Sequence, residues 1–237
     1  FVEQHNQVAN RSEALRDATL GHEQEILADL AAEATRTANT SLPDGNARAS
    51  VQATQRRLAD EGQISAYSAP QPITVLDALI AEHLLVRSPG TPAGYSFQHQ
   101  QFQEWYASFA VEHVMRNMTA GDATAAKQLA IAFLDVRPWE ESILFACERM
   151  ASGTSADLDA VAETIVRCLS IDPMLAAEII FRAPAAWGRV EHEVAGFLRR
   201  WHQPDKVDRA IGFIVNSGRP EFAELLWSLL ADSERRR

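Results

Sequence analysis

The sequence contains few of the residues that mark several classes of protein. Only two of its 237 residues are cysteines and only two are lysines. Cys147 and Cys168 each lie within an apolar, helix-like pattern, so we interpret them as buried reduced thiols rather than as a disulfide or a reactive site. No hydrophobic run approaches the ~18 residues that a membrane span requires, and no signal-peptide pattern opens the chain. We therefore expect a cytoplasmic protein that makes no membrane contact.

The motifs of common enzyme classes are also missing. Neither lysine follows a glycine, so the chain contains no phosphate-binding P-loop of the form Gly-x-x-x-x-Gly-Lys-Ser/Thr. The His-Glu pairs that begin at His22 and His192 lack the second histidine of a zinc-binding His-Glu-x-x-His helix. No Gly-x-Ser-x-Gly turn is present. We predict no catalytic residue and no metal site, and we expect that the chain is not an enzyme by itself.

Basic residues are outnumbered by acidic ones. The chain has 22 basic and 32 acidic residues and a formal net charge of -10. Nucleic-acid binders gain most of their affinity by neutralising phosphates, and a DNA-reading winged helix carries basic residues on its recognition helix or wing. The segment that could form such a unit, described below, has only scattered basic residues. Among them are Arg56, Arg57, Arg87 and Arg116. A nucleic-acid partner is therefore not expected, and a DNA-binding regulator is the least favoured interpretation.

Apolar residues recur at helical spacing along most of the chain, which is 46% hydrophobic. We predict a first helix that is capped by Ser12 and carries Leu15, Leu20, Ile26, Leu27 and Leu30. The segment "NTSLPDGNARAS" is predicted to be a loop because it contains adjacent proline, aspartate and glycine. A short helix from Val51 to Leu58 and a longer one from Ile73 to Leu84 are predicted to follow.

The convincing β signal comes directly after these helices. The segments "LLVRS" and "YSFQ" flank the connector "PGTPAG", which is rich in proline and glycine. This arrangement favours a β-hairpin. A helix before the hairpin and a helix after it would make the second half of a winged helix.

From about Ala120 onward the pattern is helical throughout. Four prolines stand at the starts of amphipathic runs, where the missing N–H costs no helical hydrogen bond: Pro138, Pro173, Pro204 and Pro220. The steps between the first three match the length of a two-helix repeat. Thr154 and Asp157 have the spacing of a capping box at the start of another helix.

The predicted fold is therefore mainly α, with a winged-helix-like unit that contains a small β-hairpin, followed by HEAT-like antiparallel helical repeats. We assign residues 1–118 to the helical and winged-helix region and residues 119–237 to the helical repeats. The chain begins with Phe1 rather than methionine, so we expect it to be a piece of a longer protein.

The segment "YSFQHQQFQEWYASFA", from Tyr95 to Ala110, holds six aromatic rings in sixteen residues. We expect the following rings to be mainly core residues that anchor a helix: Phe97, Phe102, Trp105, Tyr106 and Phe109. Glu104 is expected to cap the helix or to pair with an arginine. His99 has two interpretations: it satisfies a backbone carbonyl where hairpin and helix meet, or it contacts an anion near the helix N-terminus.

The segment "LDALIAEHLLVRSPGTPAGYSFQHQQFQEWYASFAVEHV", from Leu76 to Val114, resembles the winged-helix region of NACHT-type signal-transduction NTPases, which belong to the STAND class. That family shows an aromatic-x-Phe-x-His-x-x-Phe-Gln-Glu-aromatic-x-Ala-Ala pattern after a variable wing. The matching residues are Tyr95, Phe97, His99, Phe102, Gln103, Glu104, Trp105 and Ala107. Ser108 replaces the second alanine, and His83 replaces a glycine that often precedes the paired leucines.

The resemblance implies that His99 is a cofactor-binding residue, because the family's motif histidine contacts the β-phosphate of bound ADP and keeps the NTPase closed. It implies ADP or ATP with Mg in a full-length parent protein, and no cofactor is expected in this chain alone. The implied partners are an N-terminal NTPase core of the same chain and an unknown protein or other ligand on the repeats. In the family, exchange of ADP for ATP releases the lid and leads to oligomerisation, often in bacterial antiviral defence.

A free-standing helical-repeat scaffold that binds another protein, without any nucleotide, is the alternative interpretation. The sequence upstream of Phe1 distinguishes the two. The NTPase interpretation requires a P-loop and Mg-binding acids there, whereas the scaffold does not.

Overall fold

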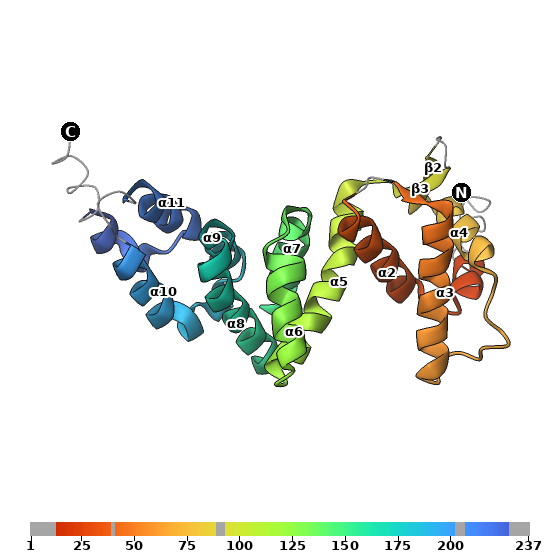
Figure 1. Cartoon of the computed structure of the whole chain (residues 1–237), viewed down its shortest axis with the longest axis horizontal. Coiled ribbons are helices and arrows are strands. Elements are labelled where there is room, and N and C mark those ends of the chain that lie inside the picture. Colours follow the sequence, from red (N-terminus) through yellow and green to blue (C-terminus); the bar gives the residue numbers. More distant parts are fainter. Residues whose placement is uncertain (1–12, 39–40, 89–92, 202–206, 228–237) are drawn as a thin grey trace, which may run out of the picture. The chain divides into compact units, whose positions relative to one another are not determined.

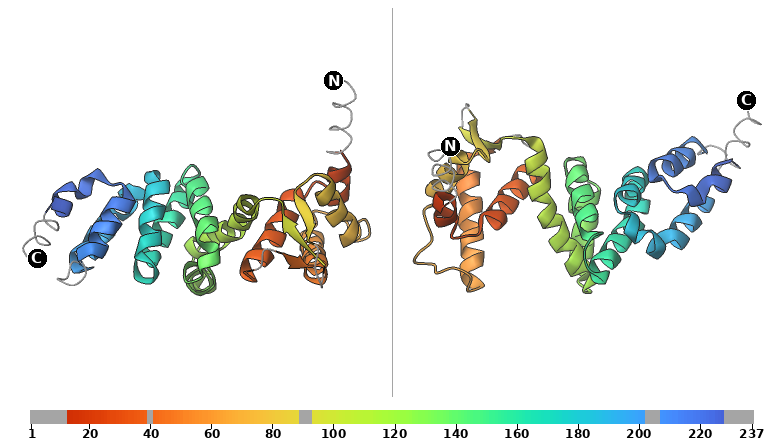
Figure 2. Two further views of the ribbon diagram at one scale, coloured as in Figure 1. Left: turned by 90° about the horizontal axis from the view of Figure 1, so that it is seen from above. Right: turned by 180° about the vertical axis from the view of Figure 1, so that it is seen from behind.

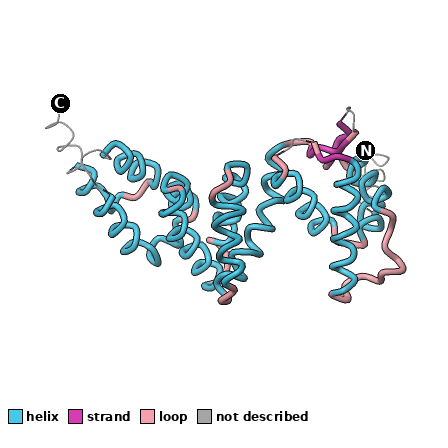
Figure 3. Tube along the Cα trace, viewed as in Figure 1, coloured by secondary structure: helices cyan, strands magenta, loops and turns pink. Residues whose placement is uncertain are grey.

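The structure is a computed structural model that describes residues 13–38, 41–88, 93–201 and 207–227. The described part of the chain is mainly helical and contains a small antiparallel sheet of three strands (Figures 1 and 3). It divides into two compact units, one within residues 1–110 and the other within residues 111–237. The division falls inside a helix, α5 (Gln100–Thr119). The functional boundary that we expect between residues 118 and 119 stays a prediction.

The first unit begins with helical residues 13–19. The elements that follow are α2 (Glu23–Arg36), β1 (Leu42–Pro43), α3 (Asp44–Asp60), α4 (Pro72–Ala81), β2 (Leu85–Ser88), β3 (Gly94–Phe97) and the start of α5. Strand β3 lies between β1 and β2 and is antiparallel to both, with Leu42 opposite Tyr95 and Leu85 opposite Phe97. The predicted hairpin is confirmed. Strand β1 was not predicted, because a two-residue strand carries no periodicity of its own.

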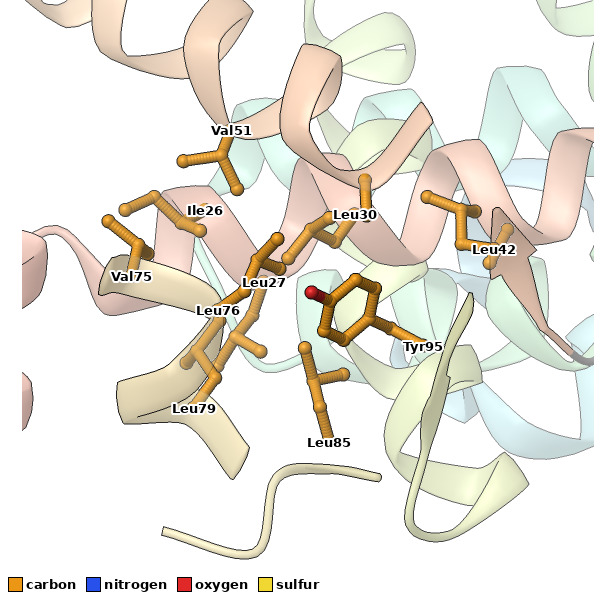
Figure 4. Packing of buried hydrophobic residues seen from close by; sticks show 12 residues of the cluster. Ile26, Leu27, Leu30, Leu42, Val51, Val75, Leu76, Leu79, Leu85 and Tyr95 are labelled. Carbon is orange, nitrogen blue, oxygen red and sulfur yellow. The ribbon is translucent and has the colours of Figure 1, made fainter. Parts of the chain in front are cut away.

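The core of the first unit lies where α2, α3 and α4 meet the sheet (Figure 4). Its buried side chains include Ile26, Leu27, Leu30, Leu42, Val51, Val75, Leu76, Leu79 and Leu85. The ring of Tyr95 lies among them, and its hydroxyl donates a hydrogen bond to Asp44 Oδ1 at 3.0 Å. A buried tyrosine that finds such an acceptor buries its ring without leaving its hydroxyl unsatisfied.

The predicted first helix is wrong in its extent. Leu20 and Gly21 have φ values of 53° and 80°, and this left-handed conformation ends the helix of residues 13–19. Helix α2 then begins at Glu23. The predicted cap, Ser12, lies outside the described residues. The apolar spacing continued across the break and gave no sign of it.

The predicted loop "NTSLPDGNARAS" is also wrong, because its described part contains β1 and the first turns of α3. An acidic residue in the first turn favours a helix start, and Asp44 occupies that position. Helix α3 is therefore longer than the predicted helix from Val51 to Leu58. Helix α4 ends at Ala81, before the predicted Leu84, because His83 has a φ of 59°.

The second unit continues from α5 with further helices and short helical turns. They are α6 (Ala123–Gln128), η1 (Leu129–Leu134), η2 (Arg137–Trp139), α7 (Glu140–Met150), α8 (Ser155–Ile171), α9 (Pro173–Arg182), η3 (Pro184–Ala186), α10 (Trp187–Trp201), α11 (Val207–Ser217) and η4 (Pro220–Phe222). Helix α9 packs against α7, α8 and α11, and α10 packs against α8 (Figure 2). Helices that are two apart in the sequence are thus neighbours in space.

Local signals in this half of the chain correspond well to the structure. Thr154 and Asp157 form the predicted capping box at the start of α8. Pro173 begins α9, whereas Pro204 lies outside the described residues. Pro138 and Pro220 lie in short 3₁₀ turns. These turns stand directly before helical residues, so proline marks helix starts here as predicted.

Both cysteines are buried and free, as predicted. Burial raises the pKa of the Cys168 thiol to about 12, and burial likewise raises the pKa of Cys147. Neither thiol forms a thiolate at neutral pH, and thiol reactivity requires the thiolate. These cysteines therefore act as small apolar core residues.

A buried carboxylate links three helices of the second unit. Glu112 on α5 is only 4% exposed, and it pairs with Arg149 of α7 and with Arg116 at 3.1 Å. Arg116 also donates to Asp157 Oδ1 of α8 at 2.8 Å. A buried charge is tolerated only when it is paired, so the network fixes how these helices meet.

Gly94→Ala is expected to lower the free energy of unfolding by about 1–3 kcal/mol because it overpacks the sheet. A Cβ added there would lie 2.5 Å from both Leu42 O and Ser41 Oγ. Gly45→Ala is the matched control, since a Cβ at that position in α3 meets nothing within 4 Å. Urea unfolding followed by circular dichroism measures both, and equal stabilities would contradict the close packing of β3 against β1.

Asp157→Asn is expected to lower the free energy of unfolding at neutral pH by about 1 kcal/mol. The Thr154 N–H and then the Arg116 guanidinium hold the pKa of Asp157 below its usual range. A depressed pKa stabilises the fold above the unfolded-state pKa of about 3.9, and this contribution is lost as the pH falls below that value. The difference between the two proteins should therefore shrink as the pH falls below about 3.9.

The matched control for this comparison is Asp159→Asn, two residues further along α8. Asp159 pairs with Arg189 at 2.7 Å, but its side chain is 54% exposed. Exposed ion pairs contribute little, so this change should be nearly neutral across the pH range. A constant difference between Asp157→Asn and the parent chain at every pH would count against the ionised carboxylate as the source of stability.

Candidate functional site

His99 is the residue that joins the hairpin to α5. Its backbone carbonyl accepts hydrogen bonds from the N–H groups of Phe102 and Gln103, at 3.0 and 3.4 Å. The preceding residue, Gln98, donates its N–H to Leu84 O at 3.2 Å. The backbone on both sides of His99 is therefore held, and the residue stands at the N-terminal end of the 20-residue helix α5.

The imidazole of His99 is exposed. Its ring lies 5.2 Å from the ring of Phe102, with an angle of 79° between the ring planes. No hydrogen bond joins the imidazole to another group in the described part of the chain. The side chain is thus available to a ligand or to another protein surface at the point where a helix N-terminus favours an anion.

The first turn of α5 is fastened to α2. Gln103 Nε2 donates to Thr35 Oγ1 at 3.2 Å, and Thr35 is only 3% exposed. The motif glutamine therefore has a structural role that sequence reasoning missed, because 68 residues separate the two partners. Glu104 accepts a hydrogen bond from Gln100 Nε2 at 2.8 Å instead of pairing with an arginine or capping the helix as we predicted.

The predicted core position is wrong for two of the motif's rings. Phe102 is 41% exposed and Trp105 is 39% exposed. Phe97 and Tyr106 are half-buried and contact each other, with 6.3 Å between ring centroids. Phe109 is also half-buried.

The reason for this arrangement is the set of small residues on the buried side of α5. Ala107 and Ser108 are fully buried, and Val111 and Met115 continue the same side one and two turns later. The helical spacing then directs Phe102 and Trp105 away from that side.

A separate cleft of about 450 Å³ lies in the first unit between α3 and the connector that leads to α4. Its lining includes Gln52, Gln55, Arg56, Asp60 and Pro70. Gln55 Nε2 donates to Pro70 O at 2.9 Å and so ties the connector to α3. His99 does not line this cleft.

The described residues contain no cluster of three or more histidine, cysteine, aspartate or glutamate side chains that would hold a metal ion. Within the same ranges, no helix combines the length and the apolar character that a membrane crossing requires. The predictions that the chain has no metal site and no catalytic residue stay predictions.

No protein-family model, curated protein or solved structure matches this chain.

Trp105→Ala is expected to lower the free energy of unfolding by less than about 2 kcal/mol, because the ring is partly exposed. Tyr95→Ala is the comparison within the same motif and should cost about 3–5 kcal/mol, since that ring is in the core. Chemical unfolding of the two variants measures the difference. A larger loss for Trp105→Ala than for Tyr95→Ala would contradict the arrangement of the motif's rings.

Proposed function

We propose that this chain is a regulatory and sensor portion of a NACHT-type NTPase of the STAND class. The first unit is a winged-helix lid that closes over ADP bound to an NTPase core of the same protein, and His99 contacts the β-phosphate. The second unit is a HEAT-like helical-repeat array that senses a ligand. ADP stabilises the closed state, and ligand binding to the repeats together with ATP stabilises the open state.

The observation that carries this proposal is the position of His99. The histidine of the family motif has an exposed imidazole, and it stands at the N-terminal end of α5. The free N–H groups of a helix N-terminus carry partial positive charge and favour phosphate groups. An imidazole beside them adds a further donor, and it adds positive charge when it is protonated.

The order of elements in the first unit supports the winged-helix assignment. A helix, a hairpin and a further helix in that order make the second half of a winged helix, and α4, the β2–β3 hairpin and α5 follow this order. Here α2, β1, α3, α4, β2 and β3 follow one another in the chain, and β3 is the central strand. His83 has a φ of 59°, the conformation that a glycine before the paired leucines would adopt readily.

The packing of the second unit supports the repeat assignment. In α-solenoids, helix pairs stack so that each helix meets its counterparts in the neighbouring pairs. Helix α9 meets α7 on one side and α11 on the other, and α8 meets α10. This arrangement is typical of stacked helical pairs.

The surface of α4 argues against DNA reading. In a DNA-binding winged helix, this element would be the basic recognition helix. The exposed positions of α4 are Thr74, Asp77 and Ala81, none of which is basic. Arg87 of β2 is paired with Asp77 at 2.7 Å.

A helical-repeat scaffold without nucleotide is the second candidate, and the second unit exposes large apolar side chains that such a scaffold would use. Phe181 on α9 is 64% exposed and Val215 on α11 is 63% exposed, and these two helices pack together. Large apolar side chains at such exposure are typical of protein-binding surfaces when they cluster. The same surface would serve as the sensor in the first candidate, so it does not separate the two.

The sequence of the reading frame upstream of Phe1 separates the two candidates directly. The proposed function requires a Gly-x-x-x-x-Gly-Lys-Ser/Thr loop and Mg-binding acids there. A frame without them would leave the scaffold as the better assignment.

His99→Ala is expected to leave the stability of the 237-residue chain within about 0.5 kcal/mol of the parent, because the imidazole is exposed. In the full-length protein, the same change should speed the release of bound ADP and raise basal activity. Release of a fluorescent ADP analogue measures the first effect. His113→Ala is the matched control, since His113 is an exposed histidine later in α5 that contacts Asn117. Equal rates of ADP release from the parent, His99→Ala and His113→Ala proteins would overturn the proposed function.

A further inference from the structure

Phe102 is a large apolar side chain whose position the core does not explain. Its ring is 41% exposed, although burial of an aromatic ring is strongly favourable. The ring instead meets the imidazole of His99 edge-on, at 5.2 Å between centroids and 79° between planes. This lies within the distance and angle that aromatic pairs prefer.

The two residues are linked through the backbone as well. The N–H of Phe102 donates to the carbonyl of His99 at 3.0 Å, which is the turn that opens α5. Residues three positions apart at a helix start face the same side. The rings of His99 and Phe102 are therefore neighbours.

The first turn of α5, which carries Phe102, is held by a hydrogen bond. Gln103, the next residue, is hydrogen-bonded to the buried Thr35 of α2. The contacts thus run from the core of the first unit through the first turn of α5 to the ring of Phe102 and then to the exposed imidazole. An exposed side chain without such a neighbour would exchange among several staggered orientations.

We propose that Phe102 is a positioning residue that holds the imidazole of His99 in one orientation at the start of α5. The held orientation lowers the entropy that is lost when the imidazole contacts an anion. The anion, the β-phosphate of ADP, rests on the proposed function. The positioning itself is a property of this chain and is measurable without nucleotide.

The first experiment measures the orientation of His99 in the 237-residue chain by NMR. The chain has seven histidines, so selective isotope labelling of histidine gives a small set of signals, and His99→Gln identifies the one from His99. Three-bond couplings across the Cα–Cβ bond report whether one side-chain orientation is populated. Phe102→Leu removes the ring and keeps an apolar side chain, and Phe102→Tyr keeps the ring.

In the parent chain and in Phe102→Tyr, we expect couplings of a single orientation for His99. In Phe102→Leu, we expect averaged couplings. Phe181→Leu is the control, because it removes an exposed phenylalanine ring in the other unit and should leave His99 unchanged. Averaged couplings in the parent chain, or a single orientation in Phe102→Leu, would overturn the positioning role.

The second experiment measures ADP release from the full-length protein. Phe102→Leu should speed release up to about tenfold, the scale of one lost aromatic contact. In a His99→Ala background it should add nothing, because it acts only through the imidazole. A further acceleration in that background would overturn the positioning role. If His99→Ala has no effect on release, the proposed function fails, and the NMR result still decides the role of Phe102.

Discussion

The first unit depends on the side chain of Tyr95. Strand β3, which carries it, is the only strand in the described sheet that pairs with both others, so loss of β3 would leave no sheet. Its ring lies among the apolar side chains of the core, and its hydroxyl reaches Asp44 in the first turn of α3. Together with Leu42 and Leu85, Tyr95 therefore joins the sheet to the helices.

The start of α5 makes buried contacts and also exposes two side chains to solvent. Gln103 donates a hydrogen bond to the buried Thr35, and Ala107 and Ser108 are fully buried. The same helical geometry leaves His99 and Phe102 exposed. A motif rich in aromatic rings therefore does not place every ring in the core. It leaves the imidazole of His99 exposed at the start of α5.

The second unit is held together by packing between helices. Its helices carry apolar faces that pack between neighbours two apart in the sequence, as α9 does between α7 and α11. At the start of the unit, the buried Glu112 adds charged contacts to Arg149 and Arg116. Apolar packing supplies most of the stability of such arrays, whereas paired buried charges restrict how the helices meet.

The sequence by itself determined the mainly helical fold, the hairpin, the capping box of Thr154 and the buried state of the cysteines, because spacing and local chemistry encode these features. Only the tertiary structure decided the existence of β1 and the exposure of Phe102 and Trp105. The physical reason is the range of the interactions. Strand β1 exists through pairing with β3 some fifty residues later, and the buried side of α5 is selected by packing partners that no local pattern contains.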